Sequence, residues 1–291
     1  MTVKTIVPFI TTPPLLAPWQ RLGKKLQMGL RACAEKDWLL TPDYFGDADM
    51  HCNQLALKQN LSQTHHAEIF DATTDSMDAS LETVDLIKEN LASHHGVELK
   101  PEPTRHPLDG AALQIPEDVL LLAPQETDDS TVWILKAASL AFPSHWVLAE
   151  KMNKPMAAIH TPVPGYGDVL ARPVDRFFTA MLKGPISQRR NWALQIDDGL
   201  FTPSRFDHPP IHTDEIASRL FVRVERQTLR KLPLSGWIVF TIQTAIAPIG
   251  MWQDDQPALD DLAALITAMT PAERDYRGVN DYLPQLLEWV K

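Results

Sequence analysis

The middle of the chain alternates between apolar runs of strand length and short polar breaks. The runs DVLLLAP (118–124) and TVWILKAASLAF (131–142) flank the polar segment QETDDS. This arrangement predicts a hairpin of two largely buried strands. Three more strands are predicted further along the chain, at residues 189–196, 219–232 and 236–249, with PLSG joining the last two.

A helix is predicted between these two groups of strands. In RPVDRFFTAMLKG, Pro173 suits the first turn and Gly184 suits the stop. The apolar positions recur at helical spacing, at Val174, Phe177, Phe178, Met181 and Leu182. The order of two strands, a helical crossover and three strands predicts an α+β fold, a PAS-like antiparallel sheet with helices packed on it and a ligand pocket between them.

Helical segments flank this core on both sides. We expect residues 1–116 to form a helical and irregular extension packed on the core, 117–250 to form the PAS-like core, and 251–291 to form a C-terminal helical segment. Before the core, SMDASLETVDLIKENLASHHG predicts a helix that ends at Gly96. Its expected apolar stripe consists of Met77, Leu81, Val84 and Leu91. After the core, Thr270 and Glu273 have the spacing of a capping box.

Composition narrows the range of functions. The 291 residues carry a formal net charge of -10, which argues against a nucleic-acid partner and is compatible with a cationic ligand. No apolar run has the length of about 20 residues that a membrane helix needs, and the start of the chain lacks a secretory leader, so we expect a cytoplasmic protein without a membrane partner. Cys33 and Cys52 are too few for a disulfide framework and lack zinc-site spacing. Nucleotide-binding glycine motifs are absent from the sequence, so any nicotinamide or flavin site is expected on another chain.

Two histidines stand in conspicuous contexts. His160 precedes Pro162 and Pro164 in AAIHTPVPGYG, and these prolines restrict the backbone that carries the imidazole. A fixed imidazole suits a metal ligand, and it equally suits a buried histidine bonded to a backbone carbonyl. In FPSHWVLAEK, His145 and Trp146 are interpreted first as a strand-to-helix turn, with Trp146 packing in the core.

Polar residues also interrupt two of the predicted strands. QRRNWAL offers Arg189, Arg190, Asn191 and Trp192 either to a planar, acid-bearing ligand or to solvent. In VRVERQT, alternation places Arg223, Glu225 and Gln227 on one face, and Val222, Val224, Arg226 and Thr228 on the other. The polar row is either an ion-pair ladder or the polar wall of a pocket.

Several long motifs resemble one family. They are WILKAASLAFPSHWVLAEKMNKPMAAIHTPVPGYG, RRNWAL and LFVRVERQTLRKLPLSGWIVFTI, in this order, together with the earlier KKLQMGLRACAEKDWLLTPDYFGD. In these stretches the chain resembles the alpha-subunit family of haem-dependent oxidative N-demethylases. The likeness covers most of the chain and is weakest over 60–113 and after Met251.

The resemblance implies a PAS-type fold that binds haem b and removes a methyl group oxidatively from a small secondary amine such as dimethylamine. On this basis His160 is the first choice for the axial iron ligand and His145 the second. Arg223 and Arg226, with Arg190 in reserve, are candidates for the haem propionates. Glu225 is the candidate for holding the substrate ammonium by charge, and Trp146 or Trp192 by a cation–π contact.

The same resemblance implies partners. NADPH, flavin and an iron–sulfur centre are expected on a reductase subunit, and a folate-linked subunit is expected beside it. Two alternatives remain open from the sequence: a haem-binding PAS-type sensor, and a haem-free binding or scaffold protein of the same fold.

Overall fold

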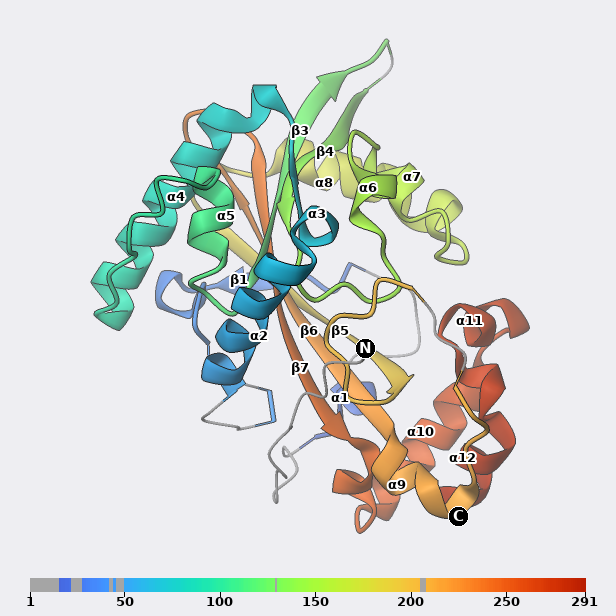
Figure 1. Ribbon diagram of the computed structural model, residues 1–291. Coiled ribbons are helices and arrows are strands. Elements are labelled where there is room, and N and C mark those ends of the chain that lie inside the picture. Colours follow the sequence, from blue (N-terminus) through green and yellow to red (C-terminus); the bar gives the residue numbers. More distant parts are fainter. Residues whose placement is uncertain (1–15, 22–27, 42–43, 46–49, 129, 205–207) are drawn as a thin grey trace.

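A computed structural model describes residues 16–21, 28–41, 44–45, 50–128, 130–204 and 208–291, and its centre is one antiparallel sheet (Figure 1). In the described residues the sheet has seven strands, in the order β1-β5-β6-β7-β3-β4-β2. The strands are β1 (Arg31–Cys33), β2 (Phe70–Ala72), β3 (Asp118–Glu126), β4 (Thr131–Ser139), β5 (Ile186–Ile196), β6 (Leu220–Lys231) and β7 (Ile238–Pro248).

The predicted order of elements is confirmed. The hairpin β3–β4 comes first, a helical crossover follows, and β5, β6 and β7 complete the core. Strand β7 then pairs with β3, so the last strand of the core lies beside the first. Both groups of strands thereby share one sheet, and the α+β prediction of an antiparallel sheet with helices packed on it is confirmed.

Helices account for much of the rest of the described chain. They are α1 (Pro18–Arg21), α2 (Met50–Thr64), α3 (His66–Ile69), α4 (Met77–Asn90), α5 (Pro107–Ala112), α6 (Leu148–Lys151), α7 (Met156–Ile159), α8 (Arg172–Ala180), α9 (Ile216–Arg219), α10 (Gln256–Ala268), α11 (Pro271–Tyr276) and α12 (Leu283–Trp289). The predicted capping box is present: Thr270 Oγ1 accepts from the Glu273 amide, and the Glu273 carboxylate accepts from the Thr270 amide. None of the described helices combines the length and the apolar character needed to span a bilayer.

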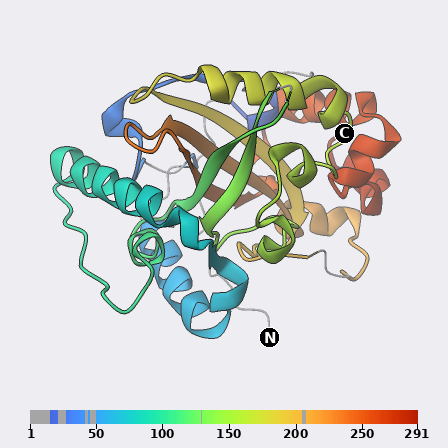
Figure 2. The same ribbon diagram turned by 90° about the horizontal axis from the view of Figure 1, so that it is seen from above.

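The two faces of the sheet have different covers. Crossover helices α6, α7 and α8 pack on the face that carries Leu120, Leu122 and Leu229. The opposite face packs against α4 and α5 at one end and against the C-terminal helices at the other. Figure 2 shows the teal helix α4 and the yellow-green helices of the crossover on different sides of the sheet. The crossover helices therefore define one separate layer, and the candidate histidines lie in that segment.

The N-terminal part of the chain completes the sheet. It supplies both edge strands, β1 beside β5 and β2 beside β4. Strand β3 pairs with β7 only as far as the Asp118–Ile242 pair, and beyond this point Gln54 of α2 donates from Nε2 to the Thr244 carbonyl at 2.5 Å. An unpaired carbonyl at this edge is thus satisfied by a side chain from the extension. Residues 1–15 of the extension lie outside the described part of the chain.

Two details of the helix predictions were wrong. Of the stripe predicted for α4, Val84 and Leu91 are buried as expected, whereas Met77 and Leu81 are 41% and 47% exposed. The other buried residues of the helix are Ala79, Ser80, Glu82, Thr83, Ile87 and Asn90. This side packs against α5, whose buried residues include Gly110, Ala111 and Ala112. After α8, Leu182 is 75% exposed, because the helix ends at Ala180 and Leu182 no longer lies on its buried stripe.

Candidate functional site

The imidazole of His160 lies directly after α7, inside the crossover. The backbone amide of His160 donates to the Met156 carbonyl, and Val163 donates back to the His160 carbonyl in the turn that contains the prolines. The ring stacks on that of Tyr166, with centroids 4.4 Å apart and planes inclined by 10°. The prolines and this stack together fix the direction of the side chain.

One ring nitrogen of His160 is occupied and the other is open. Nδ1 lies 2.9 Å from the Met156 carbonyl oxygen, which can only accept, so Nδ1 carries the proton and donates. Nε2 then bears a lone pair, and among the described residues no hydrogen bond or ion pair reaches it. A histidine whose second nitrogen donates to a carbonyl has the arrangement found in metal ligands. The bond to Met156 is equally the one expected of a structural histidine.

The environment of His160 favours its neutral form. Burial lowers the pKa of the imidazole below its usual 6.5; the hydrogen bond to Met156 acts in the opposite direction, and the positive charges of Arg189 and Lys151 lower the pKa further. The neutral ring is the form that binds iron. Burial also raises the pKa of Tyr166 to about 12, so its hydroxyl stays protonated at neutral pH.

Strand β5 contributes Arg189 on the sheet side of this site. Arg189 pairs in register with Gln227 and lies diagonal to Glu225. Its charge acts on His160, and Tyr166 and Glu225 act on it in turn, so these four side chains form one electrostatic group. Burial lowers the pKa of the guanidinium, and its Nε is buried without a hydrogen-bond partner. A cation on the crossover side of the sheet thus lies near enough to His160 to lower its pKa.

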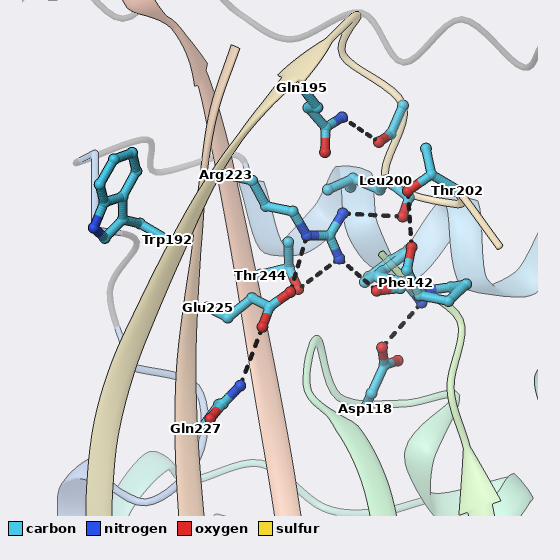
Figure 3. Close-up of polar contacts among 12 residues, drawn as sticks. Asp118, Phe142, Trp192, Gln195, Leu200, Thr202, Arg223, Glu225, Gln227 and Thr244 are labelled. Carbon is cyan, nitrogen blue, oxygen red and sulfur yellow. Dashed lines mark hydrogen bonds and ion pairs between the residues drawn. The ribbon is translucent and has the colours of Figure 1, made fainter. Parts of the chain in front are cut away.

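The polar row predicted on β6 is present as a ladder (Figure 3). Arg223 donates from Nε to Glu225 Oε1 at 3.1 Å, and Gln227 donates from Nε2 to Glu225 Oε2 at 3.1 Å. Each carboxylate oxygen of Glu225 therefore already accepts one bond from a neighbour on its own strand. The row joins the sheet side of the site to a fully buried arginine, since Arg223 is 1% exposed.

Arg223 also donates hydrogen bonds to two other segments of the chain. Its Nη2 donates to the Phe142 carbonyl at 2.5 Å, and its Nη1 donates to the Leu200 carbonyl at 3.3 Å. The 141–143 segment is fixed a second time, because the Asp118 carboxylate accepts from the amides of Ala141 and Phe142, each at 2.9 Å. Arg223 thereby ties the start of the crossover to the segment after β5.

Three other residues singled out in the sequence lie on the opposite face of the sheet from Arg223 and Glu225. Trp192 pairs with Val224 and packs with Trp19 of α1 in the apolar cluster beneath the C-terminal helices, and Figure 3 shows it directed away from the ladder. Arg226 donates to the carbonyls of Trp38 and Asp37 and to Gln188.

Arg190, also on that opposite face, lies over the Tyr44 ring at 5.2 Å. The structure therefore does not bring Trp192, Arg226 or Arg190 together with His160.

The remaining two candidates lie at the start of the crossover. His145 is exposed and adopts a left-handed conformation with a φ of 52°, and its amide donates to the Thr202 carbonyl at 2.7 Å. Trp146 is half-buried and packs against the apolar cluster beneath α6, α7 and α8, as the turn interpretation predicted for it. Trp146 thus belongs to the same layer as His160.

One residue of this group, Tyr166, was not among the sequence candidates; it stands in the turn that follows His160. Arg189 was named together with Arg190 as a candidate for an acid-bearing ligand. The alternation along β5 could have separated the two, since neighbouring strand residues point to opposite faces and Arg189 shares the parity of Asn191, which pairs with Glu225.

These features define a class: an α+β protein with an antiparallel sheet, a helical crossover on one face that carries an open imidazole nitrogen, and a half-buried guanidinium on the sheet beneath it. A family model described as haem-dependent oxidative N-demethylase, alpha subunit-like, matches residues 89–287. The chain belongs to this family. The matched range contains the crossover, the strands β3 to β7 and every candidate site residue.

The family name implies dependence on haem, and as an alpha-subunit-like family it implies other subunits. The described side chains fit such a group. His160 supplies a neutral imidazole with an unused Nε2, and Arg189 supplies a half-buried cation whose buried Nε has no partner. Haem carries both an iron that imidazole binds and carboxylates that arginine binds.

Proposed function

We propose that this chain binds haem b between the crossover and the sheet, with His160 Nε2 as the axial ligand. The single observation that carries this proposal is the tautomer of His160, in which the Met156 carbonyl holds Nδ1–H and leaves Nε2 open. Family membership supports it, and so does the lowered pKa, which keeps the imidazole neutral. His145, the second candidate, is exposed, whereas His160 is held within the crossover by the Met156 carbonyl and the Tyr166 ring.

The proposed reaction is oxidative N-demethylation of a small secondary amine. An amine R(CH₃)NH, dioxygen, two electrons and two protons give RNH₂, formaldehyde and water. One oxygen atom enters the methyl carbon and the other leaves as water, and the carbinolamine so formed loses the amine to give formaldehyde. Haem supplies the oxygen chemistry when bound, and the electrons come from a separate NADPH-dependent reductase subunit with flavin and iron–sulfur centres.

The residues of this chain would bind and orient the substrate. Glu225 carries the negative charge closest in the ladder to Arg189, and each of its oxygens has one bond and spare acceptor capacity. It is our candidate for receiving the substrate ammonium. Trp146 is the candidate for a cation–π contact, since it lies in the same layer, and the apolar cluster around it would exclude water.

Hemin titration of the purified chain tests this proposal. The native protein is expected to give a Soret band that shifts on binding, and His160→Ala to lose or shift that band while keeping its fold by circular dichroism. His145→Ala is the matched control and is expected to behave as the native chain. A native protein that folds yet takes up no hemin would overturn the proposal and favour a haem-free binding protein.

Turnover separates an enzyme from a sensor. Amine-dependent NADPH consumption with formaldehyde release is expected once a reductase is added to the haem-loaded chain. A haem-loaded chain that binds dioxygen but consumes no NADPH with any small secondary amine would favour a sensor.

A further inference from the structure

The arginines of β5 and β6 differ in how their guanidinium groups are used. Arg223 has four acceptors, which are Glu225, Leu200, Phe142 and Thr244. Arg226 likewise has four partners, on residues 33–38 and Gln188.

Arg230 forms an ion pair with Glu35 at 2.6 Å and lies over the Trp38 ring, and Arg190 lies over Tyr44. For Arg189, by contrast, no hydrogen bond, ion pair or ring contact occurs within the described part of the chain.

Arg189 is half-buried, and the lack of a partner is costly at its buried Nε. A buried donor without an acceptor loses its bonds to water and gains none in return. Arginine cannot escape this cost by losing its proton, because the guanidinium stays protonated in proteins. A folded chain that retains such a cation has a group that an incoming anion would complete.

The nearest carboxylate does not complete it. Glu225 is close enough to raise the pKa of Arg189, but it forms its ion pair with Arg223 and its other hydrogen bond with Gln227. The ladder therefore leaves the guanidinium of Arg189 without a hydrogen-bond or ion-pair partner among the described residues.

We propose that Arg189 receives a carboxylate of the ligand that binds beside His160. The planar guanidinium matches a carboxylate through two parallel hydrogen bonds, and the apolar cluster under the crossover matches an apolar ligand body. The carboxylate has two sources: a haem propionate, or the acid group of a substrate that is itself a secondary amine with a carboxylate, such as an N-methyl amino acid. This inference rests on the proposed haem site.

Porphyrins without iron test the carboxylate contact separately from iron ligation. The full chain is titrated with protoporphyrin IX and with its dimethyl ester, and porphyrin fluorescence is followed. The two ligands share the same macrocycle, but only the first has free carboxylates. The native chain is expected to bind the diacid about tenfold to a hundredfold more tightly. Arg189→Gln is expected to lose that preference. Arg190→Gln, its neighbour on the opposite face of the strand, is expected to keep it.

A second titration tests the substrate as the source. The hemin-loaded chain is titrated with N-methylglycine and with dimethylamine while the Soret band is followed. A preference for N-methylglycine that disappears in Arg189→Gln and persists in Arg190→Gln assigns the carboxylate to the substrate. If instead the preference for the porphyrin diacid in the first titration is lost in Arg189→Gln, the carboxylate belongs to haem.

The outcomes distinguish this inference from the haem proposal. If Arg189→Gln changes neither preference, the carboxylate role of Arg189 is overturned while hemin binding through His160 stands. If the diacid preference depends on Arg189 but His160→Ala leaves the hemin spectrum unchanged, the carboxylate site stands and the iron ligand is wrong. A native chain that binds neither porphyrin nor hemin overturns both.

Discussion

The rings of His160 and Tyr166 lie nearly parallel, 4.4 Å apart at their centroids. The carbonyl of Met156 fixes the imidazole at its edge, and the tyrosine fixes it at its face. Two contacts of different kinds therefore hold one side chain from two directions. Such support from neighbouring groups is what a ligand needs if it is to be aimed before the metal binds.

The stack predicts how substitutions of Tyr166 affect hemin affinity. Tyr166→Leu removes the ring face, and we expect hemin to bind about two- to tenfold more weakly, in keeping with the energy of an aromatic pair. Tyr166→Phe keeps the ring and is the matched control, with an affinity close to the native value. Soret titration measures both. Equal loss in the two variants would mean that the hydroxyl, and not the ring, supports His160.

The lowered pKa of His160 predicts the pH dependence of hemin binding. Because the folded-state pKa is lowered below 6.5, the imidazole is neutral from neutral pH down to below that value. Hemin affinity is expected to be constant between about pH 7 and 8 and to fall only when the imidazole becomes protonated, below pH 6.5. His145→Ala should keep this profile. A loss of affinity that starts above pH 6.5 would contradict the lowered pKa.

The contacts of Arg223 predict its effect on stability. Arg223→Met leaves the Phe142 and Leu200 carbonyls without their donor and Glu225 without its ion-pair partner. The free energy of unfolding is expected to fall by about 3–5 kcal/mol, as when one partner of a buried pair is removed.

Urea denaturation measures this change, and Arg172→Met, at an exposed arginine on α8, serves as the control, with an expected change within about 0.5 kcal/mol. If Arg223→Met does not fold, Thr244→Val tests the same network by removing one of its acceptors. A loss below about 1 kcal/mol for Arg223→Met would show that the network contributes little to stability.

The buried carboxyl of Glu117 is expected to make the free energy of unfolding depend on pH, independently of His160. Its Oε1 accepts from the Leu40 amide at 2.8 Å, Oε2 is buried without a partner in the described residues, and burial raises the pKa to about 6 from 4.5. Because the folded-state pKa is raised, the folded chain favours the protonated carboxyl. This contribution is complete below pH 4.5 and is lost as the pH rises through about 6.

Glu117→Gln is expected to remove this dependence. Relative to the native chain, the variant should gain about 2 kcal/mol of unfolding free energy between pH 4.5 and pH 7, from a shift of about 1.5 units. The measurement is urea denaturation of both proteins at each pH, and their difference cancels the other titrating groups. A difference that does not change with pH would show that the positive charge of Lys58 compensates the charge of Glu117.

Local sequence patterns were sufficient to predict the strands and the crossover helix of the core. Strand periods, the hairpin break and the capping box at Thr270 each depend on residues close together in the chain, and all are present in the structure. The helices are present too, but the exposure of Met77, Leu81 and Leu182 differs from the predicted stripes. The alternation along β6 also gave the shared face of Arg223, Glu225 and Gln227 correctly. Period and parity are local properties, so the sequence alone determines them.

Tertiary packing decided which side chains lie together and which hydrogen-bond partners they have. The two-residue period of a strand places the side chains of Arg189 and Arg190 on opposite faces of the sheet. Which of them lies on the side of His160 depends on which face the crossover helices cover. Likewise Arg223 and Arg226 differ little in sequence context, yet each is satisfied by carbonyls from segments distant in the chain. Hydrogen-bond partners and burial are set by contacts between distant segments, and these contacts form only in the tertiary structure.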